Sequence, residues 1–496
     1  MPLLILASVF LVATCGLVYE LIAGALASYL LGDSVLQFST VIGTYLFAMG
    51  VGSYLSKYVS RGLLLPFVQL QMLVGLLGGC STAILYLTFG YGSGFRLVLY
   101  LLVFAIGMLV GLEIPLLLRL LKDHLDFKDL VSQVLALDYV GALVASILFP
   151  LFLVPQLGLM RTAFLFGMVN VVVAMVFYHK LGKPGFTGVL VQGSAILAFL
   201  LAGALYSTQL TSLAEEALYP DEVVLTRNTP YQRIAVTRGR RETRLYLNGN
   251  LQFASADEYR YHEALVYPAL TSSPNPEHVL VLGGGDGLAV RELLKDDRVK
   301  TITLVELDPT MIDLFRNNPE LAALNHGSLS SPKVEVIYQD AFVWLEESDR
   351  KFNVALVDFP DPGNYSVGKL YTDLFYRALK SHLTDDGVAA VQCTSPMYAR
   401  RSFWCIIGTI ESAGFVVRPY HAFVPSFGEW GFALISKSHL PGHLELPPGL
   451  KFLNPAVAES MFIFPQDMAR IPADVNRLFD QSLVRYYQQD WSAMNN

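Results

Sequence analysis

Residues 279–293 read VLVLGGGDGLAVREL, an apolar run that leads through a glycine-rich turn into the start of a helix. The apolar run predicts a buried strand, and the glycines allow the backbone to approach a ligand closely. Acidic residues follow at the ends of this and of later predicted strands: Asp286, Glu306, Asp340 and Asp358. Because ligands of an open parallel sheet bind outside the carboxyl ends of its strands, we expect these four acids to converge on one site.

The charge of these acids indicates what kind of nucleotide the site binds. A nicotinamide dinucleotide carries a pyrophosphate, which helix N-termini bind and carboxylates repel. A sulfonium nucleoside is cationic and carries no phosphate, so it suits a site lined by carboxylates. Glu306, after the second strand, is placed to accept hydrogen bonds from ribose hydroxyls. The pattern favours an adenosyl-sulfonium ligand, and a nicotinamide-type domain is the alternative.

Several ordered motifs within residues 220–437 resemble those of the spermidine synthases, the polyamine aminopropyltransferases. The motifs are TPYQRI at 229–234, LYLNGNLQ at 245–252, DEYRYHE at 257–263, DFPDP at 358–362 and GEWGF at 428–432. The resemblance implies transfer of the aminopropyl group of decarboxylated S-adenosylmethionine to an amine such as putrescine, with release of methylthioadenosine and without a metal. It also implies a Rossmann-like, methyltransferase-type α/β domain behind a small β-rich subdomain, and a homodimer.

The resemblance also implies which residues line each part of the site. The residues expected at the donor are Gln232, Gly283, Gly285, Asp286, Glu306, Asp340 and Ala341. Of these, Gln232 is expected near the aminopropyl arm, Glu306 at the ribose and Asp340 at the adenine. The residues expected at the acceptor amine are His262, Asp361, Gln392 and Glu429.

Asp286 and Asp358 are expected to take part in the chemistry most directly. S-adenosylmethionine carries an α-carboxylate that Asp286 would repel, whereas the decarboxylated donor presents an ammonium that Asp286 attracts. The acceptor must attack as a neutral amine, yet alkylamines are protonated near neutral pH, like lysine with its pKa of about 10.4. By the resemblance, Asp358 orients that amine and accepts its proton, and Tyr261 hydrogen-bonds the nucleophile.

Some departures from the family pattern concern the acceptor. Asn248 replaces an acid, Phe427 stands where a tyrosine is common, and Gln392-Cys393-Thr394 stands where the family has Q-G-E. Glu429 is a candidate to replace the missing acid, and Lys369 is an unexpected neighbour for a polycation. Two alternative functions therefore stay open: an S-adenosylmethionine-dependent amine N-methyltransferase, and a polyamine carrier or sensor with a nucleotide domain.

The N-terminal part of the chain has the composition of a membrane protein. Of the 496 residues, 53% are hydrophobic and 16% are charged. The stretches long enough to cross a bilayer as helices are residues 3–31, 35–56, 63–89, 95–118, 131–154, 159–178 and 186–206. The domains that we expect are a transmembrane helical domain at 1–206, a β-rich subdomain at 215–275, a catalytic domain at 276–440 and a C-terminal extension at 441–496.

The orientation in the membrane is subject to two conflicting signals. The basic residues of the even loops are Lys57, Arg61, Arg119, Lys122, Lys128, His179, Lys180 and Lys183, and the positive-inside rule places them and the amino terminus in the cytoplasm. Seven crossings would then put the catalytic domain outside, although the implied donor is a cytosolic metabolite. We expect a multi-pass protein of the cell (inner) membrane with a cytoplasmic catalytic domain, one stretch failing to cross. Residues 186–206, interrupted by glycines and polar residues, are the weakest candidate.

Three acids, Glu20, Glu113 and Asp138, lie within the apolar stretches themselves. Such groups usually face a bundle interior or a water-filled path, so these three either bind a cation or bond to neighbouring helices. The net charge of −7 for the whole chain and the lack of a basic tract with interleaved aromatics argue against a nucleic-acid partner. The four cysteines have no metal-ligand spacing.

Overall fold

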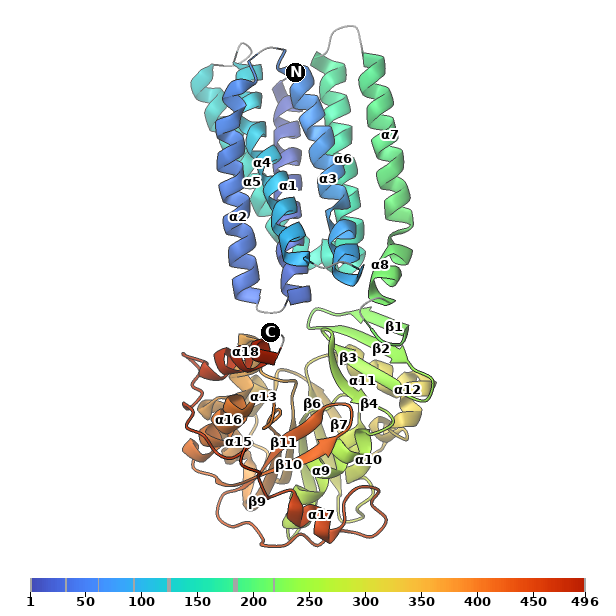
Figure 1. Ribbon diagram of the computed structural model, residues 1–496, viewed down its shortest axis with the longest axis vertical. Coiled ribbons are helices and arrows are strands. Elements are labelled where there is room, and N and C mark those ends of the chain that lie inside the picture. Colours follow the sequence, from blue (N-terminus) through green and yellow to red (C-terminus); the bar gives the residue numbers. More distant parts are fainter. Residues whose placement is uncertain are drawn as a thin grey trace. The chain divides into compact units, whose positions relative to one another are not determined.

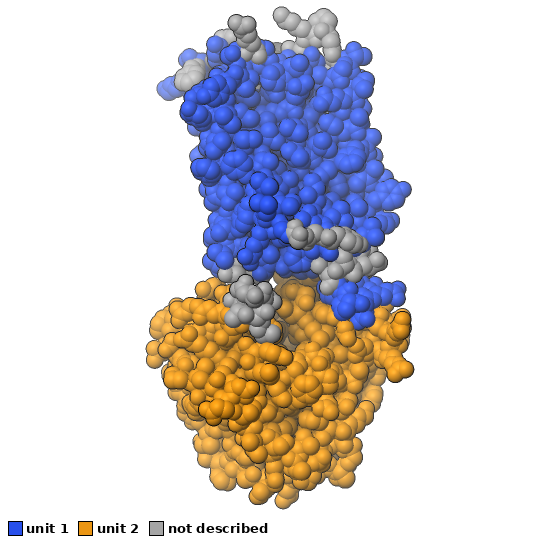
Figure 2. Space-filling model, in the orientation of Figure 1, with its two compact units in different colours: residues 1–223 blue, residues 224–496 orange. Residues whose placement is uncertain are grey.

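The computed structural model describes residues 2–31, 34–60, 62–91, 94–122, 126–181, 186–216 and 219–494. The chain divides into two compact units, Met1–Val223 and Val224–Asn496 (Figure 2). The first unit is helical, and the second combines two sheets with helices (Figure 1).

The helical unit consists of long helices that pack side by side (Figure 1). They are α1 (Pro2–Leu31), α2 (Ser34–Leu55), α3 (Leu64–Tyr91), α4 (Phe95–Leu121), α5 (Phe127–Leu148), α6 (Val154–Leu181) and α7 (Phe186–Leu205), followed by the shorter α8 (Ser207–Glu216). Short irregular helices, η1 (Ser56–Tyr58) and η2 (Phe149–Leu153), follow α2 and α5.

Six segments of the described chain are long and apolar enough to cross a membrane. One of them, Lys128–Lys180, has 53 residues and contains both α5 and α6. A continuous helix of that length would measure about 80 Å, against a hydrocarbon core of about 30 Å. The segment is broken at Gly158, whose φ of 74° and ψ of 169° are not helical, so it supplies two helices of spanning length. Residues 186–206, the stretch expected to be the weakest candidate for a membrane span, contain a continuous 20-residue helix, α7.

Two glycines set the distance between α2 and α4. A Cβ atom on Gly52 would collide with the backbone oxygen of Met108, and one on Gly111 would collide with that of Met49. Small residues at such crossings let the two helix backbones approach closely, so that the helices associate through van der Waals packing.

The three acids within the apolar stretches line two cavities. Glu113 and Asp138 line the first one, and Glu20 lines the second one with Tyr45 and Ser81. The acids therefore face the interior of the bundle.

The second unit begins with a four-stranded antiparallel sheet in the order β1-β2-β3-β4. Its strands are β1 (Glu222–Asn228), β2 (Arg233–Arg238), β3 (Thr243–Leu247) and β4 (Asn250–Ala254), and α9 (Glu258–Ser272) follows. A seven-stranded sheet in the order β10-β11-β9-β8-β5-β6-β7 forms the centre of the unit. Its strands are β5 (His278–Gly283), β6 (Thr301–Glu306), β7 (Val334–Tyr338), β8 (Phe352–Asp358), β9 (Leu383–Gln392), β10 (Val416–Val424) and β11 (Gly428–Ser436).

The central strand β5 is apolar because both faces of the sheet are covered. Val279 and Val281 pack into one hydrophobic cluster, whereas Leu280 and Leu282 pack into another. The helices between and after the strands are α10 (Leu288–Leu293), α11 (Pro309–Asn317), α12 (Pro319–Leu324), α13 (Ala341–Glu347), α14 (Tyr365–Gly368), α15 (Asp373–His382), α16 (Arg400–Ser412), α17 (Pro455–Ser460) and α18 (Ser482–Met494), with short helical turns η3 (Ser328–Ser330) and η4 (Lys369–Tyr371). The expected Rossmann-like domain is confirmed, although its sheet is mixed, because β10 and β11 run antiparallel to their neighbours.

The chain reverses its direction of travel across this sheet between β5 and β8. From β5 it continues to β6 and β7 on one side, then crosses to β8 and β9 on the other side. Such a switch point leaves a crevice at the carboxyl ends of the strands, where ligands of this fold class bind.

Candidate active site

The glycine turn after β5 forms one wall of the crevice. Gly283 pairs with Asp358 in the register between β5 and β8, and its φ of 80° lies in the left-handed region that favours glycine. A Cβ atom on Gly283 would collide with the backbone oxygen of Asp358, and one on Gly285 would stand 2.6 Å from Oε2 of Glu306. The absent side chains therefore let three strand ends bring their carboxylates together.

Asp358 is held by Tyr261 of helix α9. The Tyr261 hydroxyl donates a hydrogen bond of 2.5 Å to Oδ1 of Asp358, and the ring packs against Phe432 at 5.3 Å. Burial raises the pKa of Asp358 to about 6, although the positive charge of His262 and the bond from Tyr261 oppose that rise. A carboxylate with this pKa is mostly ionised at neutral pH yet able to accept a proton, which suits a general base.

A buried cluster of ion pairs, formed by His262, Glu258 and Arg291, lies next to these residues. His262 donates from Nδ1 to Oε2 of Glu258 at 2.8 Å, and the Arg291 guanidinium binds both oxygens of Glu258 at 3.0 and 2.9 Å. Burial lowers the pKa of His262, but the bond and charge of Glu258 outweigh it and raise the pKa to about 9. Burial likewise raises the pKa of Glu258, and its two partners bring it down to about 2. The cluster thus keeps a charged imidazolium next to the crevice.

Asp286 and Glu306 lie on the donor side of the crevice. Asp286 accepts from the backbone N–H of Leu288 at 2.9 Å, and Glu306 accepts from that of Asp308 at 3.0 Å. Burial raises the pKa of Asp286, which the charge of His262 partly offsets, and burial raises the pKa of Glu306 to about 7. Carboxylates whose pKa values are raised in this way gain most from a ligand that brings positive charge.

Asp340 caps the helix that begins at Ala341. Its Oδ1 accepts from the backbone N–H of Phe342 at 2.9 Å, and its Oδ2 binds Nζ of Lys369 at 2.6 Å. The lysine that looks out of place beside a polycation site therefore pairs with Asp340.

Asp361 is reached by a residue from the far end of the chain. The Tyr487 hydroxyl, on α18, donates to Oδ2 of Asp361 at 2.9 Å, and the Thr394 hydroxyl donates to the same oxygen at 3.1 Å. The other oxygen, Oδ1, is buried and has no hydrogen-bond partner in the described part of the chain. Burial raises the pKa of Asp361 to about 6, against the lowering effect of the bond from Tyr487.

Comparisons with known proteins match the catalytic unit, and two relatives match nearly the whole chain. The profile of the Spermine/spermidine synthase domain matches residues 258–444. The polyamine aminopropyltransferase of Leptospira interrogans is 54% identical over 487 residues, which cover 98% of each chain. Polyamine aminopropyltransferase 2 of Ralstonia nicotianae is 52% identical and also covers 98% of each chain.

The chain belongs to the polyamine aminopropyltransferase family. The enzyme is an aminopropyltransferase of polyamine biosynthesis, and its relatives match the helical unit as well as the catalytic one. A solved spermidine synthase in complex with the transition-state analogue AdoDATO is 26% identical, with a TM-score of 0.46, and covers 53% of this chain and 88% of that chain.

Three further residues of the aminopropyltransferase are already engaged within the protein. Gln392 donates to the backbone oxygen of Phe359 at 2.5 Å and to the Tyr371 hydroxyl at 2.6 Å, so it holds the loop that carries Asp361. Gln232 donates to Oδ2 of Asp308 at 3.1 Å. The carboxylate of Glu429, expected to replace a missing acid, pairs with Nδ1 of His421 at 2.8 Å.

Two features of this site could not be predicted from the motifs. His262 and its partner Glu258 lie in one family motif and on one helix, but Arg291, which also binds Glu258, comes from another helix that meets α9 only in the fold. Tyr487 lies outside the resembling segment, and the only available signal was a run of aromatic residues with helical spacing near the end of the chain.

Glu258→Gln is expected to lower the free energy of unfolding by about 3–5 kcal/mol, because it leaves two buried cations without their carboxylate. The loss should be measurable by denaturant or thermal unfolding of the purified full-length enzyme. Glu277→Gln, which removes only an exposed pair with Lys300, is the control and should leave the melting temperature nearly unchanged.

The same cluster sets the pH range in which the wild type is stabilised. The contribution of His262 is complete below its ordinary pKa of 6.5 and is lost as the pH rises through about 9. That of Glu258 is complete above 4.5 and is lost as the pH falls toward 2. The difference between wild type and Glu258→Gln should therefore be largest between pH 4.5 and 6.5, and a difference that does not shrink toward pH 9 would contradict this assignment.

Proposed function

We propose that this protein is a membrane-bound polyamine aminopropyltransferase that transfers the aminopropyl group of decarboxylated S-adenosylmethionine to a small amine such as putrescine. The observation that carries the proposal is the crevice in which burial raises the pKa values of Asp286, Glu306, Asp358 and Asp361. A cationic sulfonium donor and a cationic amine both bring positive charge, which stabilises the ionised forms of these carboxylates.

The donor is proposed to bind along the ends of β5, β6 and β7. Asp286 attracts the ammonium of the aminopropyl arm, and Glu306 accepts hydrogen bonds from the ribose hydroxyls. Asp340 and the start of α13 at Ala341 border the adenine. Gly283 and Gly285 leave room for the nucleoside, since a side chain at either position would meet Asp358 or Glu306.

The reaction needs one base and no metal in this proposal. The acceptor nitrogen attacks the methylene carbon next to the sulfonium, the carbon–sulfur bond breaks, and methylthioadenosine leaves with the bonding electrons. Asp358 orients the amine and takes the proton that the new carbon–nitrogen bond releases. Tyr261 fixes the carboxylate for this transfer through its 2.5 Å hydrogen bond.

The far end of the acceptor is proposed to bind at Asp361. Its Oδ2 is occupied by Tyr487 and Thr394, so the unpartnered Oδ1 is available to a second ammonium group. Glu429 does not serve this purpose in our proposal, because its carboxylate is paired with His421.

The helical unit is proposed to anchor the enzyme in the cell membrane, because six of its segments have the length and apolarity of membrane spans. We place the catalytic unit in the cytoplasm, where a nucleoside donor is available. The seven helices α1–α7 then put Lys57, Arg119 and Lys180 on the opposite side, against the positive-inside rule. Arg61 and Lys183 lie outside the described residues.

Purified enzyme is expected to form methylthioadenosine from the decarboxylated donor and putrescine, and Asp358→Asn should lower kcat by a factor of at least about 100 because the base is removed. In the wild type, kcat/KM should fall as the pH drops below about 6, where Asp358 and Asp361 become protonated. Product analysis by liquid chromatography measures both effects.

Asp385→Asn, at a fully exposed carboxylate, is the control and should retain full turnover. Formation of S-adenosylhomocysteine from S-adenosylmethionine, with no methylthioadenosine from the decarboxylated donor, would identify a methyltransferase instead.

Tyr487→Phe is expected to raise the KM for putrescine by about tenfold, because it removes a hydrogen bond to the charged Asp361. The affinity for methylthioadenosine and the kcat at saturating amine should stay close to wild type, since neither depends on this hydroxyl. Tyr486→Phe is a matched control on the same helix, because the Tyr486 hydroxyl bonds to Asp474 instead. Equal KM values for the two variants would remove Tyr487 from the acceptor site.

Reporter fusions at the C-terminus of the full chain are expected to place the catalytic unit inside the cell. A fluorescent protein should fluoresce there and an alkaline phosphatase should be inactive, because the latter folds only outside the cytoplasm. The reverse pattern would show that the basic loops determine the orientation.

A further inference from the structure

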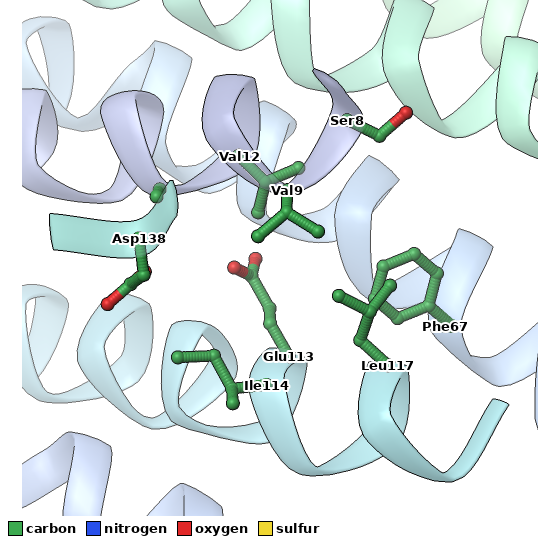
Figure 3. A pocket seen from close by; sticks show the side chains of 9 residues that line it. Ser8, Val9, Val12, Phe67, Glu113, Ile114, Leu117 and Asp138 are labelled. Atoms are coloured by element: carbon green, nitrogen blue, oxygen red, sulfur yellow. The ribbon is translucent and has the colours of Figure 1, made fainter. Parts of the chain in front are cut away.

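A small cavity lies within the helical unit, between helices α1, α3, α4 and α5 (Figure 3). Its volume is about 20 Å³, whereas a cavity needs roughly 10–15 Å³ to hold a water molecule. It therefore admits one group of the size of a water molecule or of an ammonium head. Its walls are mainly apolar and include Val9, Val12, Phe67 and Leu117.

Glu113 of α4 points its carboxylate into this cavity (Figure 3). Only 5% of the residue is exposed, and its Oε1 has no hydrogen-bond partner in the described part of the chain. Gln71 of α3, which is 0% exposed, likewise has no partner there for its amide nitrogen or oxygen. Buried polar groups are almost always hydrogen-bonded, so an orphaned carboxylate at a cavity indicates a missing ion or ligand.

Two other polar groups of the helical unit are committed elsewhere. Arg119, on the same helix, donates to the backbone oxygens of Val59 and Ser56 at 3.0 and 2.6 Å. Tyr45 donates to the backbone oxygen of Gly16 at 2.9 Å. The Gln71 amide interacts with the Glu113 carboxylate, but Oε1 of that carboxylate keeps no hydrogen-bond partner among the described residues.

Asp138 of α5 also lines this cavity, although its carboxylate points away from that of Glu113 (Figure 3). No Lys, Arg or His lies among the described residues that line it. Two acids that share an apolar site repel each other when both are ionised, and a cation between them removes that repulsion.

We propose that this cavity binds the ammonium group of an aliphatic amine. An ammonium head has three hydrogen-bond donors, which suit carboxylate acceptors, and it is of the size that the cavity admits. A hard metal ion is a poorer fit, because it takes six or more oxygen ligands and no described group of three His, Cys, Asp or Glu residues has metal-binding geometry.

This site is separate from the acceptor pocket, because all of its residues belong to the helical unit. The proposal therefore goes beyond aminopropyl transfer and does not require it. If the proposed function also holds, the helical unit binds the same chemical class that the catalytic unit uses or produces.

Equilibrium dialysis of the full-length enzyme with radiolabelled putrescine tests the site. Asp361→Asn should remove the acceptor site and leave one amine bound per chain. Adding Glu113→Gln should weaken the remaining binding at least about tenfold, because the charge-assisted hydrogen bond is lost. Asp129→Asn, at an exposed acid near the start of α5, is the matched control and should bind like the parent.

The ligand and the fold are controlled separately. n-Butylamine should compete for the site, whereas the uncharged 1,4-butanediol should not. Leu117→Phe fills the cavity without changing either acid and should also abolish binding, which keeps the test decisive if Glu113→Gln does not fold. Single variants Glu113→Gln and Leu117→Phe should retain aminopropyl transfer, which reports that the catalytic unit is intact.

The proposal is overturned if the Asp361→Asn enzyme binds no amine, or if Glu113→Gln binds it as tightly as the parent. Glu113 would then be an uncharged acid of the bundle core. Failure of the wild type to form methylthioadenosine would count against the proposed function and leave this binding result unaffected.

Discussion

The pairing of Gly283 with Asp358 at the centre of the large sheet is the constraint on which the active site depends. It fixes the ends of β5 and β8 side by side, and the missing side chains at Gly283 and Gly285 allow Asp358 and Glu306 to close in on the turn. Carboxylates gathered in this way repel one another. His262, charged through its bond to Glu258, offsets part of this repulsion because it lies beside Asp286 and Asp358.

The loop after β8 links the two ends of the crevice. Asp361 near its beginning accepts from Tyr487, and Lys369 near its end binds Asp340 at the edge where we place the adenine. Gln392 holds the start of the loop, because its side chain donates a hydrogen bond to the backbone oxygen of Phe359. The same loop therefore positions groups at the proposed donor and acceptor sites. Helix α18 contacts this loop through Tyr487, although it lies outside the segment that resembles the family.

The parts of the structure that sequence could predict are those with local signals. Val279 to Leu282 are apolar in succession because both sheet faces are covered. Asp286, Glu306 and Asp358 lie near one another because parallel strands end at one edge, whereas the place of Asp340 in the same site stays a prediction. Glycines and polar residues within 186–206 do not break the helix, since glycines are tolerated in a helix that packs against neighbours, as α7 does; whether α7 crosses the membrane stays a prediction.

The parts that sequence could not predict depend on contacts between distant segments. Tyr487 and Asp361 are 126 positions apart, and nothing near either residue encodes their meeting. Arg291 joins Glu258 across 33 positions, so a histidine that the motif alone assigns to substrate acts also as a fixed positive charge. For Glu113 the sequence showed a carboxylate in an apolar run, whereas the cavity beside it follows only from how four helices pack.

The fixed imidazolium has a consequence for how ligands arrive. His262 partly offsets the rise that burial causes in the pKa values of Asp286 and Asp358, so it favours their ionised forms before any ligand is present, and ionised carboxylates attract cations. This attraction increases the rate at which cationic molecules reach the crevice. Dissolved ions screen it, with a Debye length of about 8 Å at physiological ionic strength. The speed at which this enzyme captures its polycationic partners is thus tied to the salinity of its surroundings.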